Sequence, residues 1–178
     1  MEPFEVTYRH PEPLESRHGL NDFECQSDEQ TSWLRRHALQ AVATGTAKVF
    51  VVTEHNDNAV VAYYAWSMAS IGAEESPSRL LKGAGRYPQP VALLARLGVD
   101  NGHTGHGLGA GLLQDVMART AEISTDIGCR GLLVHAETEQ ARNFYLYLVP
   151  EFEPSPTDEL HLVLLIKDIK AAIRTGPP

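Results

Sequence analysis

The chain has 178 residues, of which 43% are hydrophobic, and a formal net charge of −8 at pH 7. This length predicts one domain, residues 1–178, with a single core. The negative charge excludes nonspecific nucleic-acid binding over the whole surface. No apolar run reaches the length of a membrane span, and the first residues lack the basic and apolar regions of a signal peptide. We therefore expect no membrane contact. Because Cys25 and Cys129 form neither a metal-ligand spacing nor a disulfide framework, we expect a reducing, cytoplasmic setting.

The N-terminal part predicts a short strand and then one amphipathic helix. Residues 4–8 alternate weakly between polar and apolar side chains, as in a short strand, and residues 10–13 break it. After a polar loop, Asp28 is suited to cap a helix. The helix is expected over residues 29–44, because its apolar residues recur with helical spacing and form one face.

Three β-prone segments follow. Residues 48–53 are rich in β-branched side chains, and residues 59–67 form the second arm of a hairpin behind a polar turn. Residues 71–90 are expected to be irregular, and a connection of this length is usually functional or disordered. Residues 91–99 are almost continuously apolar, which is typical of a central strand covered on both faces.

The C-terminal half predicts alternating helices and strands. Apolar residues at helical spacing predict a helix that begins near Leu108 and ends before Gly128. The remaining elements are, in chain order, a buried strand over residues 131–136, a helix over residues 139–148 capped by Thr138, a strand over residues 160–166 and a terminal helix over residues 167–174. This order predicts an α/β fold with a mixed central sheet flanked by helices.

A glycine-rich stretch, residues 104–111, joins the strand over residues 91–99 to the next helix. Such a junction is a common anion site, because glycine lets the backbone approach a phosphate and the first helical N–H groups point at it. A Walker loop needs Lys and then Ser or Thr after its last glycine, but Ala110 and Gly111 stand there. The dinucleotide fingerprint belongs near the start of a βαβ unit, whereas this stretch lies past the middle of the chain and fits the fingerprint only in its permissive form. A glycine turn without a ligand is the remaining alternative.

Residues 104–109, TGHGLG, resemble the pyrophosphate loop of the GNAT superfamily of acyl-CoA-dependent N-acetyltransferases, with Thr104 where that family usually has Gln or Arg. The element order is also similar to the GNAT fold, in which the strand before the loop splays from the next strand and acetyl-CoA lies in the gap. The resemblance implies acetyl-CoA as donor, held in part by main-chain groups of Leu97 and Val99. The loop residues implied to bind it are Thr104, Gly105, His106, Gly107, Leu108, Gly109 and Ala110.

Further segments narrow the resemblance to one subgroup. They are the glycine loop and residues 96–100, 133–136, 141–145 and 152–156. Together they are similar to the GNAT toxins of bacterial toxin–antitoxin pairs, which acetylate the α-amine of aminoacyl-tRNA and block translation. The resemblance implies an aminoacyl-tRNA substrate, a ribbon-helix-helix antitoxin partner and a homodimer.

Tyr145 is the residue that we expect to act as general acid. A phenol with a pKa of about 10 stays protonated at neutral pH and can give its proton to a thiolate leaving group. The family resemblance places its hydroxyl close to the sulfur and implies that Asn143 hydrogen-bonds the CoA arm. Tyr147 is the alternative donor on the same helix, and aromatic residues at this spacing also occur as plain helix core.

No strong general base stands out, although Glu137, His135 or a water molecule can serve. An α-amine has a pKa of about 8 and is partly neutral in the cell, whereas a lysine amine, with a pKa of about 10.4, needs a base. The lack of a base therefore mildly favours an aminoacyl ester over a lysine side chain. His103 and His106 have no third ligand nearby, and we expect no metal site.

Basic residues gather in one acid-free segment of this acidic chain, residues 77–99. They are Arg79, Lys82, Arg86 and Arg96. We expect the first three to contact tRNA phosphates, with a second contact at Arg35 and Arg36 on the first helix. The alternative for both groups is a solvated surface.

Two other functions stay open. An acetyltransferase of a small metabolic amine or of a protein N-terminus uses the same chemistry on another acceptor. A degenerate GNAT domain binds acyl-CoA or a partner without catalysis. The acid-free segment favours tRNA over a metabolic amine, while Tyr145 and the intact glycine loop argue against a non-catalytic domain.

Overall fold

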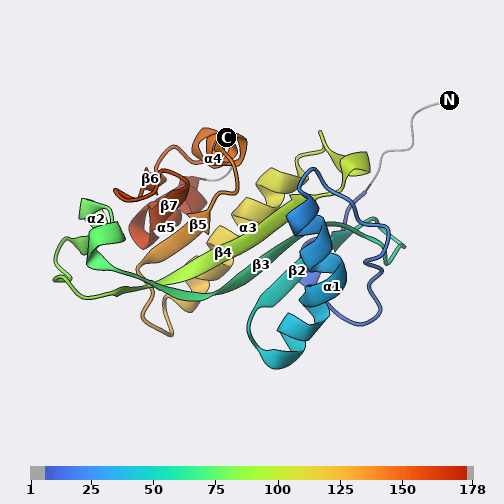
Figure 1. Ribbon diagram of the computed structural model, residues 1–178, viewed down its shortest axis with the longest axis horizontal. Helices are drawn as coiled ribbons and strands as arrows, with labels where there is room; N and C mark the ends of the chain where they lie inside the picture. The colour runs from blue at the N-terminus through green and yellow to red at the C-terminus, as the bar shows by residue number, and fades with distance from the viewer. Residues whose placement is uncertain (1–6, 176–178) are drawn as a thin grey trace. The chain divides into compact units, whose positions relative to one another are not determined.

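A computed structural model describes residues 7–175 (Figure 1). Its strands are β1 (Glu12–Pro13), β2 (Lys48–Thr53), β3 (Val60–Ile71), β4 (Gln89–Val99), β5 (Gly131–His135), β6 (Glu153–Pro154) and β7 (His161–Leu165). The strand order in the sheet is β1-β2-β3-β4-β5-β7-β6. The α-helices are α1 (Asp28–Thr44), α2 (Ser78–Leu81), α3 (Leu108–Ile123), α4 (Glu139–Leu148) and α5 (Ile166–Thr175). Two 3-10 turns are η1 (Ala73–Glu75) and η2 (Asn101–His103). The mixed sheet with helices confirms the predicted α/β class.

The chain divides into two compact units, of which the first contains the residues up to Trp66 together with Arg96–Leu113. Strands β1, β2 and β3 pair antiparallel there, and α1 packs on β2. The buried Tyr63 ring stacks on Trp33 at 6.1 Å between centroids, and its hydroxyl donates to the Gln30 carbonyl at 2.7 Å. A Cβ on Gly98 would lie 3.2 Å from the Tyr63 ring, so this part of β4 is packed tightly against β3. These contacts hold the strand that leads into the glycine loop.

The second unit contains Ser67–Ala95 and the residues from Gln114 onward. Strand β4 runs parallel to β5 over Ala92–Leu94, opposite Leu132–Val134, and β5 pairs antiparallel with β7 along its whole length. Helix α5 packs on β5 and β7 (Figure 1). One hydrophobic core cluster of this unit contains Ile71, Leu80, Val91, Leu133, Val163 and Leu165.

The N-terminal prediction is wrong in its details. Residues 4–6 of the expected first strand lie outside the described residues, and Tyr8 forms only an isolated bridge with Glu54. The first strand is instead β1, in the segment that was expected to break it, and it pairs with Val51 and Phe50. Pro13 is tolerated because β1 lies at the edge of the sheet, where one side of the strand needs no ladder hydrogen bond.

Helix boundaries agree with the sequence more closely. Ser27, not Asp28, caps α1, since its side chain accepts from the Gln30 N–H, while Asp28 is the first residue of the helix. Thr138 caps α4 as predicted, by accepting from the Ala141 N–H. The segment expected to be irregular contains the end of β3, η1 and α2. No helix among the described residues is long and apolar enough to cross a membrane.

Candidate active site

The glycine loop has the backbone of an anion site. Gly105 and Gly107 have φ values of +82° and +76°, a left-handed conformation that glycine adopts without a steric penalty. No atom lies within 4 Å of the position that a Cβ would take on either residue. The loop therefore presents bare backbone next to open space, as close approach of a phosphate requires.

Helix α3 begins directly after this loop, and its first N–H groups lack helical acceptors. The first helical hydrogen bond runs from the Gly111 N–H to the Gly107 carbonyl at 3.0 Å. In a helix that starts at Leu108, the N–H groups of Leu108, Gly109 and Ala110 have no carbonyl in a preceding turn. Gly107 has no side chain that can cap them. The positive end of the helix dipole adds to these donors, so the loop fits a pyrophosphate.

His103 and His106 are held by residues that the sequence analysis missed. The Tyr8 hydroxyl and His103 Nδ1 share a hydrogen bond of 2.8 Å, and His103 Nε2 lies 3.4 Å from the Glu54 carboxylate. The Tyr8 ring also meets the His106 ring edge-on at 5.8 Å. Burial, and then the charge of Glu54, raises the pKa of the Tyr8 phenol. The segment before the loop is thus tied to the N-terminal part of the same unit.

The ring nitrogens of His103 are engaged by other side chains of the protein. Both ring nitrogens of His103 are occupied by Tyr8 and Glu54. Within residues 7–175, no group of three His, Cys, Asp or Glu side chains is placed to hold a metal ion. The contacts of His103 give it a structural role beside the loop.

Leu97 and Val99 lie at the end of β4, and both are partly buried. The strand pairs with β5 only as far as Leu94, and β4 continues to Val99. The Asp100 N–H donates to the Val61 carbonyl at 2.8 Å. The Asp100 side chain accepts from the N–H groups of Glu24 and Gly102, both at 2.9 Å. Asp100 therefore fixes the exit of β4, while main-chain binding by Leu97 and Val99 stays a prediction.

Tyr145 lies on α4 in the second unit, whereas the glycine loop belongs to the first. Its side chain is 6% exposed, and its ring meets Phe144 and Phe152 edge-on. Burial raises the pKa of the Tyr145 phenol above its usual value, so the group is protonated at neutral pH. Tyr147 is 85% exposed, and Asn143 is exposed on the same helix. Of the two tyrosines, Tyr145 is the buried one, and its role as general acid stays a prediction.

His135 is the better defined of the two side chains considered as a base. It lies at the end of β5 and stacks on His161 of β7 at 3.9 Å between centroids. Partial burial lowers the pKa of His135, and the charge of His161 lowers it further. His135 is therefore neutral at neutral pH and able to accept a proton. Glu137 is exposed beyond the end of the strand.

The basic residues fall into two groups. Lys82 and Arg86 are exposed between α2 and β4, and Arg35 and Arg36 are exposed on α1. Arg79, in contrast, pairs with two carboxylates of its own unit, Glu153 and Asp168, the second at 3.0 Å. Its charge is thus compensated within the protein, which leaves Lys82 and Arg86 as the better candidates for phosphate contacts in this segment.

Arg96 also has internal partners. Its guanidinium lies 5.1 Å from the centre of the Trp33 ring, and Nη1 is 3.3 Å from both Glu29 Oε1 and Gln30 Oε1. A guanidinium over an indole face is a favourable cation–π contact. Arg96 therefore joins the end of β4 to the first turn of α1.

Solved structures of bacterial toxins share this fold. A tyrosine-to-phenylalanine variant of KacT superposes with a TM-score of 0.85 at 21% identity, over 93% of this chain and 98% of that one. AtaT complexed with acetyl-methionyl-tRNAfMet has a TM-score of 0.83 at 24% identity, over 94% of this chain and 98% of that one. The fold and the glycine loop thus define the class, an α/β protein with the GNAT fold, as the sequence predicts.

Proteins that are similar in sequence identify the family of this chain more specifically than the fold does. No protein-family model matches the chain. A tRNA-acetylating toxin of Mycobacterium tuberculosis is 37% identical over 166 residues, 93% of this chain and 97% of that protein. A protein of Sinorhizobium fredii described as a probable toxin TacT is 28% identical over 167 residues, 90% of this chain and 92% of that protein. The chain belongs to the family of tRNA-acetylating GNAT toxins.

Proposed function

We propose that this protein is an acetyl-CoA-dependent N-acetyltransferase that acetylates the α-amine of aminoacyl-tRNA and thereby blocks translation. The similarity that carries the proposal is the 37% identity to a tRNA-acetylating toxin over 93% of the chain. The glycine loop supports it, because its backbone and open space suit a pyrophosphate. We further propose that residues 1–178 form one acetyltransferase domain.

The chemistry needs a held donor, a neutral amine and a proton for the departing sulfur. Acetyl-CoA supplies the acetyl group as a thioester. The N–H groups from His106 to Ala110 bind its pyrophosphate, Leu97 and Val99 offer main-chain partners to its amide-bearing arm, and Asn143 adds a side-chain contact. The Val99 N–H is the proposed donor to the carbonyl oxygen, on which negative charge builds.

Tyr145 is the proposed general acid. The amine nitrogen forms a bond to the acetyl carbon as the carbon–sulfur bond breaks, and Tyr145 gives its phenolic proton to the sulfur. The nitrogen loses one proton in the same reaction, which passes to solvent and balances the proton that Tyr145 regains. Because burial favours the neutral phenol, Tyr145 holds its proton until the sulfur departs.

The α-amine of an aminoacyl ester reacts without a strong base. Its pKa is at or below about 8, so a large fraction is neutral at cellular pH. His135 is neutral as well, since its pKa is lowered, and it is proposed to relay the proton that the nitrogen loses on to solvent. A lysine acceptor, with a pKa of about 10.4, would depend on such a base far more strongly.

The proposed tRNA contacts and the proposed antitoxin partner are argued from the same family. Lys82 and Arg86 are proposed to contact tRNA phosphates, with Arg35 and Arg36 as a second contact. Arg79 is proposed to support this segment through its ion pairs with Glu153 and Asp168. A solved structure of AtaT holds the C-terminus of the antitoxin AtaR, and KacT has been solved in a complex with its partner and DNA. By analogy we propose a ribbon-helix-helix antitoxin, a homodimer and a cytoplasmic location.

Charge reversal in the exposed basic segment tests the substrate assignment. Lys82→Glu with Arg86→Glu should abolish acetylation of charged tRNA while acetyl-CoA affinity, measured by calorimetry, stays unchanged. Lys48→Glu with Lys167→Glu is the matched control, because both lysines are exposed elsewhere and the change in net charge is identical. Equal loss in both double variants would show a general charge effect and contradict the assignment.

A further inference from the structure

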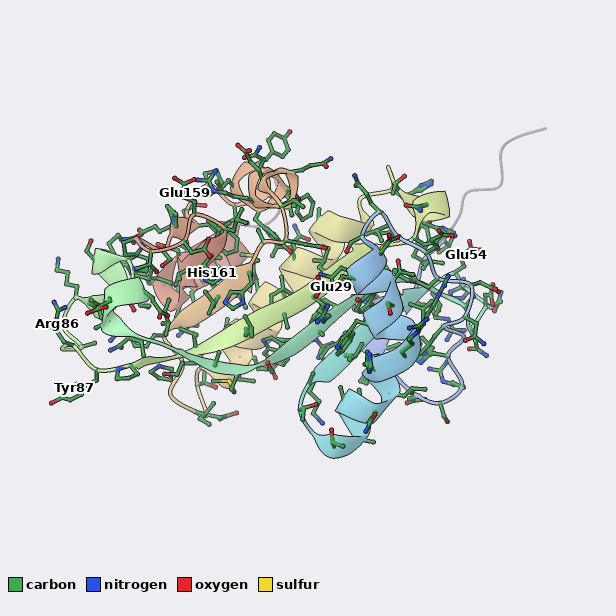
Figure 2. All side chains as sticks on the ribbon, viewed as in Figure 1. Glu29, Glu54, Arg86, Tyr87, Glu159 and His161 are labelled. Atoms are coloured by element: carbon green, nitrogen blue, oxygen red, sulfur yellow. The ribbon has the colours of Figure 1, made fainter. Side chains whose placement is uncertain are left out.

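An exposed aromatic ring stands beside two basic residues in the connection between α2 and β4. Tyr87 is 75% exposed, and Lys82 and Arg86 are exposed as well. Figure 2 shows Arg86 and Tyr87 at the turn that leads into β4, with both side chains directed away from the ribbon. The proposed chemistry assigns no role to this ring.

The turn that carries Tyr87 has a defined backbone. Gly83 and Gly85 have φ values of +78° and +74°, which other residues rarely adopt. The buried Gln89 side chain donates from Nε2 to the Tyr87 carbonyl at 2.6 Å. A Cβ on Gly85 would lie 3.3 Å from Cδ2 of Tyr87, so the ring rests against this glycine. The backbone that carries the ring is therefore held in place, and the ring keeps a large surface open.

The base of the connection is anchored to the core of the second unit. Leu80 is fully buried, and its carbonyl accepts from Arg130 Nη2 at 2.7 Å. The Ala84 N–H donates to the Leu81 carbonyl at 3.0 Å, which closes the turn after α2. Tyr87 is thus presented from a fixed support, which lowers the entropy cost of using it for binding.

The segment that carries the ring is basic, and two of its cations have no ion pair in the described part of the chain. Residues 77–99 contain no Asp or Glu. In the part of the chain that the structure describes, neither Lys82 nor Arg86 has an ion-pair partner, whereas Arg79 of the same segment has two. Exposed aromatic rings with adjacent cations are how proteins bind unpaired nucleotides, since the ring stacks on a base and the cations meet the phosphates.

We infer that Tyr87 is a stacking platform for an unpaired base of the RNA substrate, flanked by phosphate contacts from Lys82 and Arg86. The inference rests on the proposed function. It adds a residue that recognises an unpaired base, whereas Lys82 and Arg86 recognise phosphate charge. Stacking needs the ring but not the hydroxyl, and it releases no counterions. These two properties separate Tyr87 from its basic neighbours in an experiment.

The test measures the affinity of the full-length protein for deacylated bacterial tRNA at several salt concentrations. Tyr87→Ala should weaken binding by about 5- to 100-fold, the usual range for losing one base–aromatic stack. The slope of log affinity against log salt should stay unchanged in this variant, whereas Lys82→Ala or Arg86→Ala should each reduce it by about one unit. Tyr87→Phe should restore affinity to within about twofold, because the ring remains.

A preference for unpaired bases gives a second readout. Wild type should bind a short unstructured RNA more tightly than a blunt RNA hairpin of equal length, and Tyr87→Ala should lose most of that difference. Ile127→Ala is the control, since Ile127 is an exposed apolar residue of another loop. Wild-type affinity in Tyr87→Ala, or equal losses in Tyr87→Ala and Tyr87→Phe, would overturn the stacking role alone. Absence of any tRNA binding by wild type would overturn the proposed function together with it.

Discussion

Gly107 and Gly111 offer a matched pair of substitutions at the start of α3. Gly107 has a φ of +76°, while Gly111 lies inside the helix with its N–H bonded to the Gly107 carbonyl. No atom lies within 4 Å of the Cβ position of either residue. A new methyl group meets no atom of another segment at either place, so the effects on stability come from the local backbone conformation.

The two alanine variants should move stability in opposite directions. Gly107→Ala puts an L-residue in the left-handed region at a cost of about 1–2 kcal/mol. Gly111→Ala removes a glycine from a helix and gains about 1 kcal/mol. Since 1 kcal/mol shifts the melting temperature of a domain of this size by about 2–4 °C, Tm should fall by about 2–8 °C for Gly107→Ala and rise by about 2–4 °C for Gly111→Ala.

Affinity for acetyl-CoA then separates a phosphate loop from a plain turn. Gly107→Asp adds an anion where the pyrophosphate is proposed to bind. Two like charges at about 4 Å repel by about 1 kcal/mol in bulk water and about 4 kcal/mol near a protein surface. Calorimetry should therefore show acetyl-CoA binding weakened by about 5- to 1000-fold, with circular dichroism unchanged. Gly111→Ala should bind as wild type does. Wild-type affinity in Gly107→Asp would refute the loop assignment.

Three further substitutions test other parts of the structure. Tyr145→Phe should lower kcat by about 100-fold or more and leave acetyl-CoA affinity unchanged; near-normal turnover would exclude Tyr145 as the acid. Gly131→Ala should cost at least about 1–3 kcal/mol, because its Cβ would collide with the Leu164 carbonyl on β7, and an unchanged denaturation midpoint would contradict that packing. Hydrogen bonding from His18 holds the pKa of Glu12 below its usual value, so the stability that Glu12 contributes is present above the unfolded pKa of about 4.3 and is lost as pH falls through the folded pKa. Glu12→Gln should therefore be less stable than wild type at neutral pH but not in acid, as denaturant titrations at the two pH values will show.

The regular elements were predictable where local patterns decide them. The bounds of β2 match the β-branched run at residues 48–53, and Thr138 caps α4 as its position suggests. Ser27 and Asp28 are adjacent residues with similar capping preferences, so only the structure distinguishes them. Strand β1 has two residues and depends on partners in β2, and a short strand of this kind leaves no periodic signal in the sequence.

The backbone conformation of the glycine loop was predictable from the sequence. The contacts between residues far apart in the chain were not. The left-handed conformations of Gly105 and Gly107 follow from a glycine-rich junction between strand and helix. The partners of Arg79 are far away in the sequence, 89 residues in the case of Asp168, so its charge looked available for RNA. Tyr8 reaches His103 across 95 residues. Such pairs exist only once the chain is folded.

The central claim is that the acceptor is the amino acid carried by tRNA. The direct measurement incubates the protein with acetyl-CoA and a pool of charged tRNA, digests the RNA and identifies the aminoacyl-adenosine products by mass spectrometry. The expected result is N-acetyl-aminoacyl-adenosine that is absent without enzyme and that forms about 100-fold or more slowly with the Tyr145→Phe variant. Unmodified charged tRNA, together with acetylation of a free polyamine or a peptide N-terminus, would contradict the claim and assign the enzyme to a metabolic or protein substrate.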